Sequence, residues 1–491
     1  MAAAQAFVAA PAGPAGRAQA SGLQATPAAA AGGAALRAQD AAAPAGRGSA
    51  TGGALVCALA VAGGRGALKQ RRRKARTVAV RAVRRPCHGG EHLSEERKAE
   101  LVGVVQQICT PGKGITATDE GPGTIGIRFE AVGVENTEEN RRQYRQMLYK
   151  TPGINQYLSA AILDPETIYQ KDDDGKLFPE VLSNLGIVPG IKPHLKVYTL
   201  PGTGGDTVMQ GLDSLSARCA EYKAAGCKFA KWRSPLAITE DGCPTDLAIK
   251  ANMEDLARYA LICQDEGLVP IVEPDIVMKG THTLKTAVEV NTQVQSALYK
   301  AMLDHGVFME GCVMKTNLVN PGLDCPESYT VEEIADANLT VLRRVMPMAV
   351  PGVNYLSGGQ SLEDAAARLD AMNKMKTKEP WNLSFSWSWA LQAPLFKLCE
   401  GTGGKMPLDD MGALYLEELG TASAAALGKH EPAPGDGGHT AKKVARPTVG
   451  IGINGFGRIG RQVARIVMKD PETELRLVNA SYDAERILRT R

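Results

Sequence analysis

The sequence predicts an α/β fold, a (β/α)8 TIM barrel, and three observations support this prediction. Apolar runs typical of buried strands end at Lys231, Glu273, Lys315 and Ser357, which are spaced at a constant interval of 42 residues. Stretches with the periodicity of amphipathic helices separate these runs. Each run ends in polar residues, and barrels of this kind carry their active sites at the carboxyl ends of the strands. We therefore expect polar residues from several strands to meet at one rim.

The expected strands follow one another along the chain from residue 113 to residue 387. Three runs precede Lys231, four end at the positions named above, and one follows them. In chain order they are 113–120, 157–163, 185–192, the runs ending at Lys231, Glu273, Lys315 and Ser357, and 382–387. Eight strands is the number that closes such a barrel.

The helices expected between the strands have recognisable ends. Asn136 with Glu139 is predicted to form a capping box at the start of one helix. Residues 206–226 place an apolar stripe on one helical face, and the glycine at the end of this range predicts a helix stop. Thr330 with Glu333 predicts a second capping box.

The chain divides into four parts by composition. These are a leader (1–90), the barrel (91–430), a linker (431–447) and a short partial Rossmann-like βαβ fragment (448–491). The leader holds 13 Lys or Arg residues and one acid, and its Ala, Gly and Pro content predicts disorder. Such a leader is typical of an organelle transit peptide, here of the plastid type. A disordered basic tail without a targeting role is the alternative.

Charge and cysteine content exclude several classes of function. The net charge of +3 arises mostly in the leader and indicates no nucleic-acid partner. The apolar stretch 53–64 is too short to span a bilayer, so no stable membrane association is expected. It fits a secretory signal core or a weak anchor. The ten cysteines form no CxxC pair, which indicates a reducing compartment, and no cluster with metal-ligand spacing occurs.

Lys315 is the residue that points most directly to chemistry. It lies at the end of an apolar run, where burial disfavours the ammonium form and can produce a neutral, nucleophilic amine. A single lysine in such a place more often extends its charged end to solvent. The charged residues at neighbouring strand ends, Lys231 and Glu273, favour the chemical interpretation over that one.

Four segments of the chain resemble class I, Schiff-base fructose-bisphosphate aldolases. They read FAKWR at 229–233, VEP at 272–274, EGCVMKTN at 310–317 and LSGGQ at 356–360. The likeness extends over about residues 92–430 and keeps the family's order. It implies a lyase that cleaves fructose 1,6-bisphosphate into dihydroxyacetone phosphate and glyceraldehyde 3-phosphate, in glycolysis or the Calvin cycle.

The resemblance also implies roles for the residues at the strand ends. Lys315 is the Schiff-base nucleophile, and Lys231 lowers its pKa and polarises the carbinolamine oxygen. Glu273 is the general acid that expels the carbinolamine hydroxyl, and Asp119 takes the proton from the substrate C4 hydroxyl. Asp275 replaces a second glutamate of the family and is one methylene shorter. The family needs no metal and no other cofactor.

The same comparison assigns the substrate's phosphates. Ser357, Gly358 and Gly359 are expected to bind a phosphate through backbone N–H groups at the start of a helix. Arg128 and Arg233 match further positions that line the site.

Two departures affect the second phosphate. Leu195 stands where the family has a lysine, and Ser388–Trp389 stands where it has a Gly-Arg clamp. A tryptophan cannot make the bidentate contact that arginine makes with phosphate. Lys196 is the candidate replacement, although alternation along a strand would turn it to the opposite face.

The C-terminal fragment carries a separate motif. Gly455, Gly457 and Gly460 form the GxGxxG of a dinucleotide-binding turn between a strand and a helix. The string GINGFGRIGR at 452–461 resembles the start of glyceraldehyde-3-phosphate dehydrogenase. Ala480 stands where that family has its ribose-binding acid, and the Rossmann half is incomplete. We therefore expect no NAD site.

The sequence thus predicts a plastid aldolase that acts on small sugar phosphates, and the family suggests a homotetramer. Two alternatives are a bifunctional aldolase–dehydrogenase and a non-catalytic barrel that serves as a scaffold.

Overall fold

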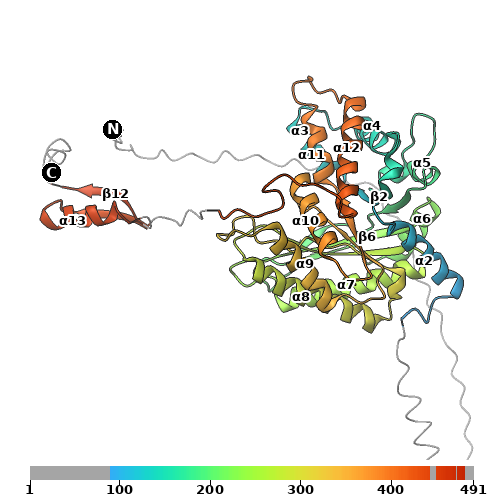
Figure 1. Cartoon of the computed structure of the whole chain (residues 1–491), viewed down its shortest axis with the longest axis horizontal. Helices are drawn as coiled ribbons and strands as arrows, with labels where there is room; N and C mark the ends of the chain where they lie inside the picture. Colours follow the sequence, from blue (N-terminus) through green and yellow to red (C-terminus); the bar gives the residue numbers. More distant parts are fainter. Residues whose placement is uncertain (1–88, 443–448, 471–472, 481–491) are drawn as a thin grey trace, which may run out of the picture. The chain divides into compact units, whose positions relative to one another are not determined.

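A computed structural model describes residues 89–442, 449–470 and 473–480 (Figure 1). The leader, apart from its last two residues, lies outside this range, and so does the apolar stretch 53–64. The barrel and the C-terminal fragment are described separately below.

The predicted eight-stranded barrel is confirmed. The strands close in the order β1-β10-β9-β8-β7-β6-β3-β2, and every neighbouring pair is parallel. Their bounds are β1 Gly114–Thr118, β2 Leu158–Leu163, β3 Val188–Ile191, β6 Phe229–Ala237, β7 Val269–Val277, β8 Val313–Met314, β9 Gly352–Tyr355 and β10 Asn382–Trp387. Parallel strands buried on both faces read as continuous apolar runs, which is why the sequence pattern identified them.

Helices surround the strands, as Figure 1 shows for α7, α8, α9 and α10. The helices of this part are α2 Glu95–Ile108, α3 Pro122–Ala131, α4 Glu138–Lys150, α5 Phe178–Asn184, α6 Leu215–Ala224, α7 Asp246–Asp265, α8 Leu284–His305, α9 Val331–Val345, α10 Leu362–Met375, α11 Trp389–Lys397 and α12 Leu408–Ala426. Leu101, Val105 and Ile108 of α2 pack against the inward-facing strand residues. The barrel interior is therefore a filled core, which leaves its polar rim for function.

The helix predicted over 206–226 is wrong in its first half. Residues Thr207–Met209 form β5, which pairs antiparallel with β4, Val197–Thr199. Gly211, with φ +126°, and Ser214, with φ 56°, then turn the chain before α6 begins. Helical periodicity misled here because residues 207–209 pair with β4 as a strand, and Met209 is buried from that strand and not from a helical face.

The two predicted capping boxes differ in outcome. Thr330 and Glu333 form one, since each side chain accepts a hydrogen bond from the other's backbone N–H. The box at Asn136 is wrong, because the N-cap is Thr137, whose hydroxyl accepts from Asn140 N. Asn136 instead donates to Pro122 O at 3.1 Å, so its amide binds the first residue of α3.

The described part of the expected linker packs against the barrel. Residues 429–442, which we name the C-terminal strap, follow α12. Tyr329 and His439 exchange backbone hydrogen bonds, and Lys442 N donates to Cys325 O. The strap is therefore an ordered part of the barrel unit up to residue 442.

The C-terminal fragment has the predicted strand–helix–strand form. Its elements are β11 Val449–Asn454, α13 Arg458–Val467 and β12 Thr473–Asn479, and the two strands are parallel. No helix in the described ranges of the whole chain is both long and apolar enough to cross a bilayer.

Candidate active site

One cavity at the rim brings together most of the residues that the sequence singled out. Its volume is about 300 Å³. The predicted residues that line it are Asp119, Arg128, Lys231, Arg233, Glu273, Asp275, Lys315, Ser357, Gly358 and Gly359. Arg128 lies on α3, and the others lie on strands or in the loops that follow them, because parallel strands present their carboxyl ends on one side of the barrel. The strands predicted to end at Lys231 and Glu273 run on to Ala237 and Val277, so those two residues lie within β6 and β7.

Lys315 directly follows β8, and its backbone N–H donates to Val272 O of the neighbouring strand at 2.9 Å. Its side chain is only 4% exposed, and its Nζ lies 3.6 Å from Glu273 Oε2. The same oxygen lies 3.1 Å from Lys231 Nζ, which in turn lies 2.7 Å from Asp119 Oδ2. Two ammonium groups and two carboxylates thus alternate in a row across the rim.

Glu273 Oε2 occupies a special place in this row. It is buried between two lysines, 3.1 Å from Lys231 Nζ and 3.6 Å from Lys315 Nζ. A carboxylate oxygen shared by two lysines in this way is placed to exchange a proton with a group bound to Lys315.

The electrostatics distinguish the two lysines. Burial lowers the pKa of Lys315; the Glu273 carboxylate opposes this and the Lys231 ammonium adds to it. Burial acts in the same direction on Lys231, but Asp119 and Glu273 outweigh it and raise the pKa of Lys231. For Asp119, burial favours a higher pKa, but the neighbouring lysines hold its pKa well below the usual range. Lys315 is thus the lysine suited to act as a free amine.

Arg233 and Asp275 form a separate ion pair on the adjacent wall. Arg233 Nε and Nη2 both lie 2.7 Å from Asp275 Oδ2. Burial raises the pKa of Asp275 although Arg233 opposes the shift. This pair separates Asp275 from the lysines, so it lines the cavity without joining the row of alternating charges.

A tight turn follows β9 at Ser357–Gln360. Gln360 N donates to Ser357 O at 3.0 Å, and Gly358 and Gly359 have φ values of 59° and 88°, which favour glycine. Their N–H groups have no acceptor among the described residues. The next residue, Ser361, caps α10. Free N–H groups beside a helix start are suited to bind an anion.

Comparison with known proteins gives this geometry a family. The model of class I fructose-bisphosphate aldolase matches residues 100–446. Human fructose-bisphosphate aldolase C is 47% identical over 361 residues, which cover 73% of this chain and 98% of the relative. The chain belongs to the class I fructose-bisphosphate aldolases. It is thus a lyase with fructose-bisphosphate aldolase activity, and this class works through a Schiff base without a metal.

Two further relatives agree with this membership. Cytosolic fructose-bisphosphate aldolase 5 of Arabidopsis thaliana is 48% identical over 333 residues, which cover 67% of this chain and 91% of that one. A solved fructose-bisphosphate aldolase of Plasmodium falciparum, in complex with TRAP and a small-molecule inhibitor, superposes with a TM-score of 0.67 at 39% identity. That likeness covers 70% of this chain and 98% of the other.

Among the described residues, no group of His, Cys, Asp or Glu is arranged to hold a metal ion.

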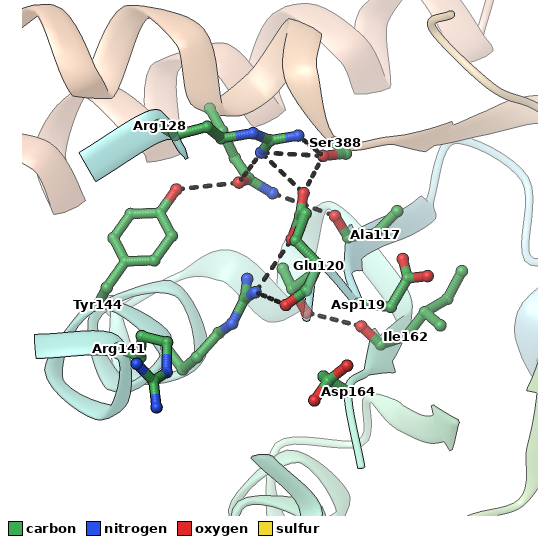
Figure 2. Close-up of polar contacts among 12 residues, drawn as sticks. Ala117, Asp119, Glu120, Arg128, Arg141, Tyr144, Ile162, Asp164 and Ser388 are labelled. Carbon is green, nitrogen blue, oxygen red and sulfur yellow. Dashed lines mark hydrogen bonds and ion pairs between the residues drawn. The ribbon is translucent and has the colours of Figure 1, made fainter. Parts of the chain in front are cut away.

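One part of this aldolase's rim was missed by the sequence reasoning. Glu120 lies between two arginines, at 2.8 Å from Arg128 Nη1 and 3.0 Å from Arg145 Nη2 (Figure 2). Ser388 hydrogen bonds to Glu120 and accepts from Arg128. Burial favours a higher pKa for Glu120, but the two arginines lower it overall. The place of Glu120 directly after Asp119, at a strand end, was the available signal.

Arg128 is also held from its other side. Gln392 Oε1 accepts from its Nη1 at 2.9 Å, and the Trp389 ring lies 5.2 Å from its guanidinium carbon. Such a stacked arrangement is a cation–π contact. Trp389 therefore packs against Arg128 on this wall of the cavity.

Lys196 lies away from the cavity. It is exposed on the β4 side of the hairpin, with its Nζ 5.8 Å from the Tyr198 ring, and Leu195 is 67% exposed. Lys192, which the sequence reasoning left unassigned, reaches the rim instead. Its Nζ donates to Asp119 O and lies 2.8 Å from Asp164 Oδ2. The structure thus places Lys196 outside the cavity, and strand alternation does not decide its position because residues 192–196 lie between β3 and β4.

The C-terminal fragment matches the NAD-binding domain of glyceraldehyde 3-phosphate dehydrogenase over residues 449–490. Gly455 has φ +97°, and Gly457 is the N-cap of α13. A Cβ on Gly460 would collide with Gly455 O. The three glycines of the motif therefore form the close turn that their spacing predicted.

Proposed function

We propose that Lys315 is the residue that forms the Schiff base in this aldolase. The observation that supports this most is the position of Glu273 Oε2, which is buried 3.6 Å from Nζ of the lysine whose pKa is lowered. The neutral amine of Lys315 attacks the substrate ketone and gives a carbinolamine. The Glu273 carboxylate takes the proton that the Lys315 ammonium releases and then donates it to the carbinolamine hydroxyl, which leaves as water and produces an iminium ion.

Carbon–carbon cleavage follows from the iminium. A base takes the proton of the C4 hydroxyl, the C3–C4 bond breaks with release of glyceraldehyde 3-phosphate, and the electron pair passes to the iminium nitrogen to give an enamine. We assign the base to Asp119, whose lowered pKa keeps it ionised and whose Oδ2 lies 2.7 Å from Lys231. Protonation of the enamine and hydrolysis then release dihydroxyacetone phosphate. Lys231 stabilises negative charge on the reacting oxygens throughout.

The turn at Ser357–Gly359 is the proposed site for the phosphate nearest the ketone. Its free N–H groups and the start of α10 support this assignment, together with the proximity of Lys315 in the same cavity. Arg233 and Arg128 line the wall that faces the rest of the substrate. The test is steady-state cleavage of fructose 1,6-bisphosphate by Lys315→Ala, which we expect to show no turnover. Measurable turnover in that variant would assign the nucleophile elsewhere.

We also propose that residues 1–90 direct this aldolase to a plastid and are then removed. The support is composition, because the leader is basic, alanine-rich and nearly free of acids. Retention of a leader–fluorescent-protein fusion in the cytosol would contradict this. We further propose that the mature chain forms a homotetramer and acts in the Calvin cycle. Analytical ultracentrifugation of the mature chain tests its assembly state.

A further inference from the structure

The C-terminal strap is bound to α10 as well as to the loop before α9. His430 N donates to Asp370 Oδ1 at 2.9 Å, and Gly437 N donates to Asp364 Oδ1 at 2.9 Å. Gly437 is buried and has φ +77°. A Cβ at this position would lie 2.7 Å from Val331 Cγ2, so the strap passes α9 and α10 in close contact.

Arg368, on α10, donates hydrogen bonds to the strap. It is 5% exposed. Its Nε donates to Gly437 O at 2.7 Å and its Nη2 donates to Gly438 O at 2.9 Å. Burial lowers its pKa although the Asp364 carboxylate opposes the shift, and no carboxylate in the described part of the chain forms an ion pair with it. Strap carbonyls therefore replace the counter-ion that a buried guanidinium normally has.

The third contact of Arg368 leads to the phosphate turn. Its Nη1 donates to Gln360 Oε1 at 2.5 Å, and Gln360 Nε2 donates to Ser357 O at 2.7 Å. Gln360 is itself buried, so its amide has one orientation that satisfies both partners. A second cavity, of about 420 Å³, lies between the turn and the strap and is lined by Gly359, Arg368 and Gly438. On the side of the turn that faces the strap, the turn is thus supported by the hydrogen bonds from Arg368 through Gln360 and not by close packing alone.

We propose that Arg368 is a positioning residue that couples docking of the strap to phosphate binding at the turn. With the strap docked, both strap carbonyls hold the guanidinium against Gln360, which fixes the carbonyl of Ser357. With the strap displaced, two buried donors of Arg368 lose their acceptors, and the charged group is driven towards solvent. Gln360 then loses its support, and the turn loses the geometry that directs its N–H groups to the phosphate. This inference rests on the proposed role of the turn.

The direct test compares Arg368→Met and Arg368→Lys with the parent in the full chain. We expect Arg368→Met to raise the KM for fructose 1,6-bisphosphate, and the inhibition constant of inorganic phosphate, by about tenfold or more. The kcat at saturation should stay within about threefold, because the row of charges around Lys315 is untouched. The KM and the phosphate inhibition constant of Arg368→Lys should lie between those of the parent and of Arg368→Met, since an ammonium cannot contact three divergent acceptors at once.

A second variant perturbs the strap and leaves Arg368 in place. Gly437→Val collides with Val331 and cannot easily adopt φ +77°, so we expect it to reproduce the KM increase. Combined with Arg368→Met it should add little, because both changes break the same connection. Glu431→Gln is the control, as Glu431 is an exposed residue of the strap, and its kinetics should match the parent.

Three results would overturn the inference. The first is a KM and a phosphate inhibition constant within twofold of the parent in both single variants. The second is a parallel collapse of kcat and of melting temperature, which would show a role in folding only. The third is full additivity of the two changes. Covalent trapping of dihydroxyacetone phosphate at saturating concentration separates the two proposals. If the parent enzyme gives no trapped product, the proposed function itself is contradicted, whatever the variants show.

Discussion

Replacing Glu273 by glutamine removes the carboxylate that lies between Lys231 and Lys315 while keeping the size of the side chain. Two unit charges 3.6 Å apart interact by roughly 4–5 kcal/mol at an effective dielectric constant of about 20. Without that attraction the pKa of Lys315 should fall further, so the supply of neutral amine should not limit the variant. The loss should come from the missing proton donor. General acid–base groups contribute about 10²- to 10⁴-fold.

We therefore expect Glu273→Gln to lower kcat by about 10²- to 10⁴-fold with little change in KM. The assay is a coupled measurement of dihydroxyacetone phosphate release, with a single-turnover experiment to follow iminium formation. Dehydration of the carbinolamine should become the slow step. Glu310→Gln, at an exposed position, is the matched control and should be silent. A kcat within threefold of the parent would refute the assignment of Glu273 as the acid.

The remaining predictions concern the pH profile and two regions outside the cavity. The positive charge of Lys231 lowers the pKa of Lys315, so Lys231→Met should raise the pKa of Lys315. The rise of borohydride trapping with pH should then begin at a higher pH than in the parent, and an unchanged pH dependence would contradict this. Lys196→Ala should leave the KM for fructose 1,6-bisphosphate within about twofold of the parent value, because the Lys196 side chain is exposed beside Tyr198. A tenfold rise in KM would show that Lys196 does bind the substrate. Deletion of residues 443–491 should leave aldol cleavage within a few-fold and remove no NAD affinity, as judged by calorimetry of both forms. Micromolar NAD binding that disappears on deletion would show that the fragment is functional.

The barrel and most of the rim were predictable because the strands are buried on both faces. Their apolar runs are continuous, and the lysines and carboxylates that end them stand out at a constant interval of 42 residues. Lys231, Glu273 and Lys315 lie in one cavity for that reason. The regular βα repeat converts equal spacing in sequence into neighbouring positions in space.

The features that the sequence did not predict depend on contacts between distant segments. The pairing of Glu120 with Arg145 joins the end of β1 to α4, and nothing in either local pattern marks it. The strap is rich in Gly and Pro, like a linker, and only the acceptors it offers to Arg368 reveal that it is docked. The hairpin before α6 was mistaken for a helix because apolar spacing alone does not identify the partner that buries each residue.

Borohydride trapping with dihydroxyacetone phosphate, followed by peptide mapping, identifies the lysine that forms the Schiff base. The reductant converts the iminium into a stable secondary amine and so marks the lysine that carried it. We expect a single labelled peptide that contains Lys315, no label in Lys315→Ala, and unchanged labelling and cleavage after treatment with EDTA. Labelling at Lys231 or at any other lysine, or loss of cleavage in EDTA, would contradict this expectation.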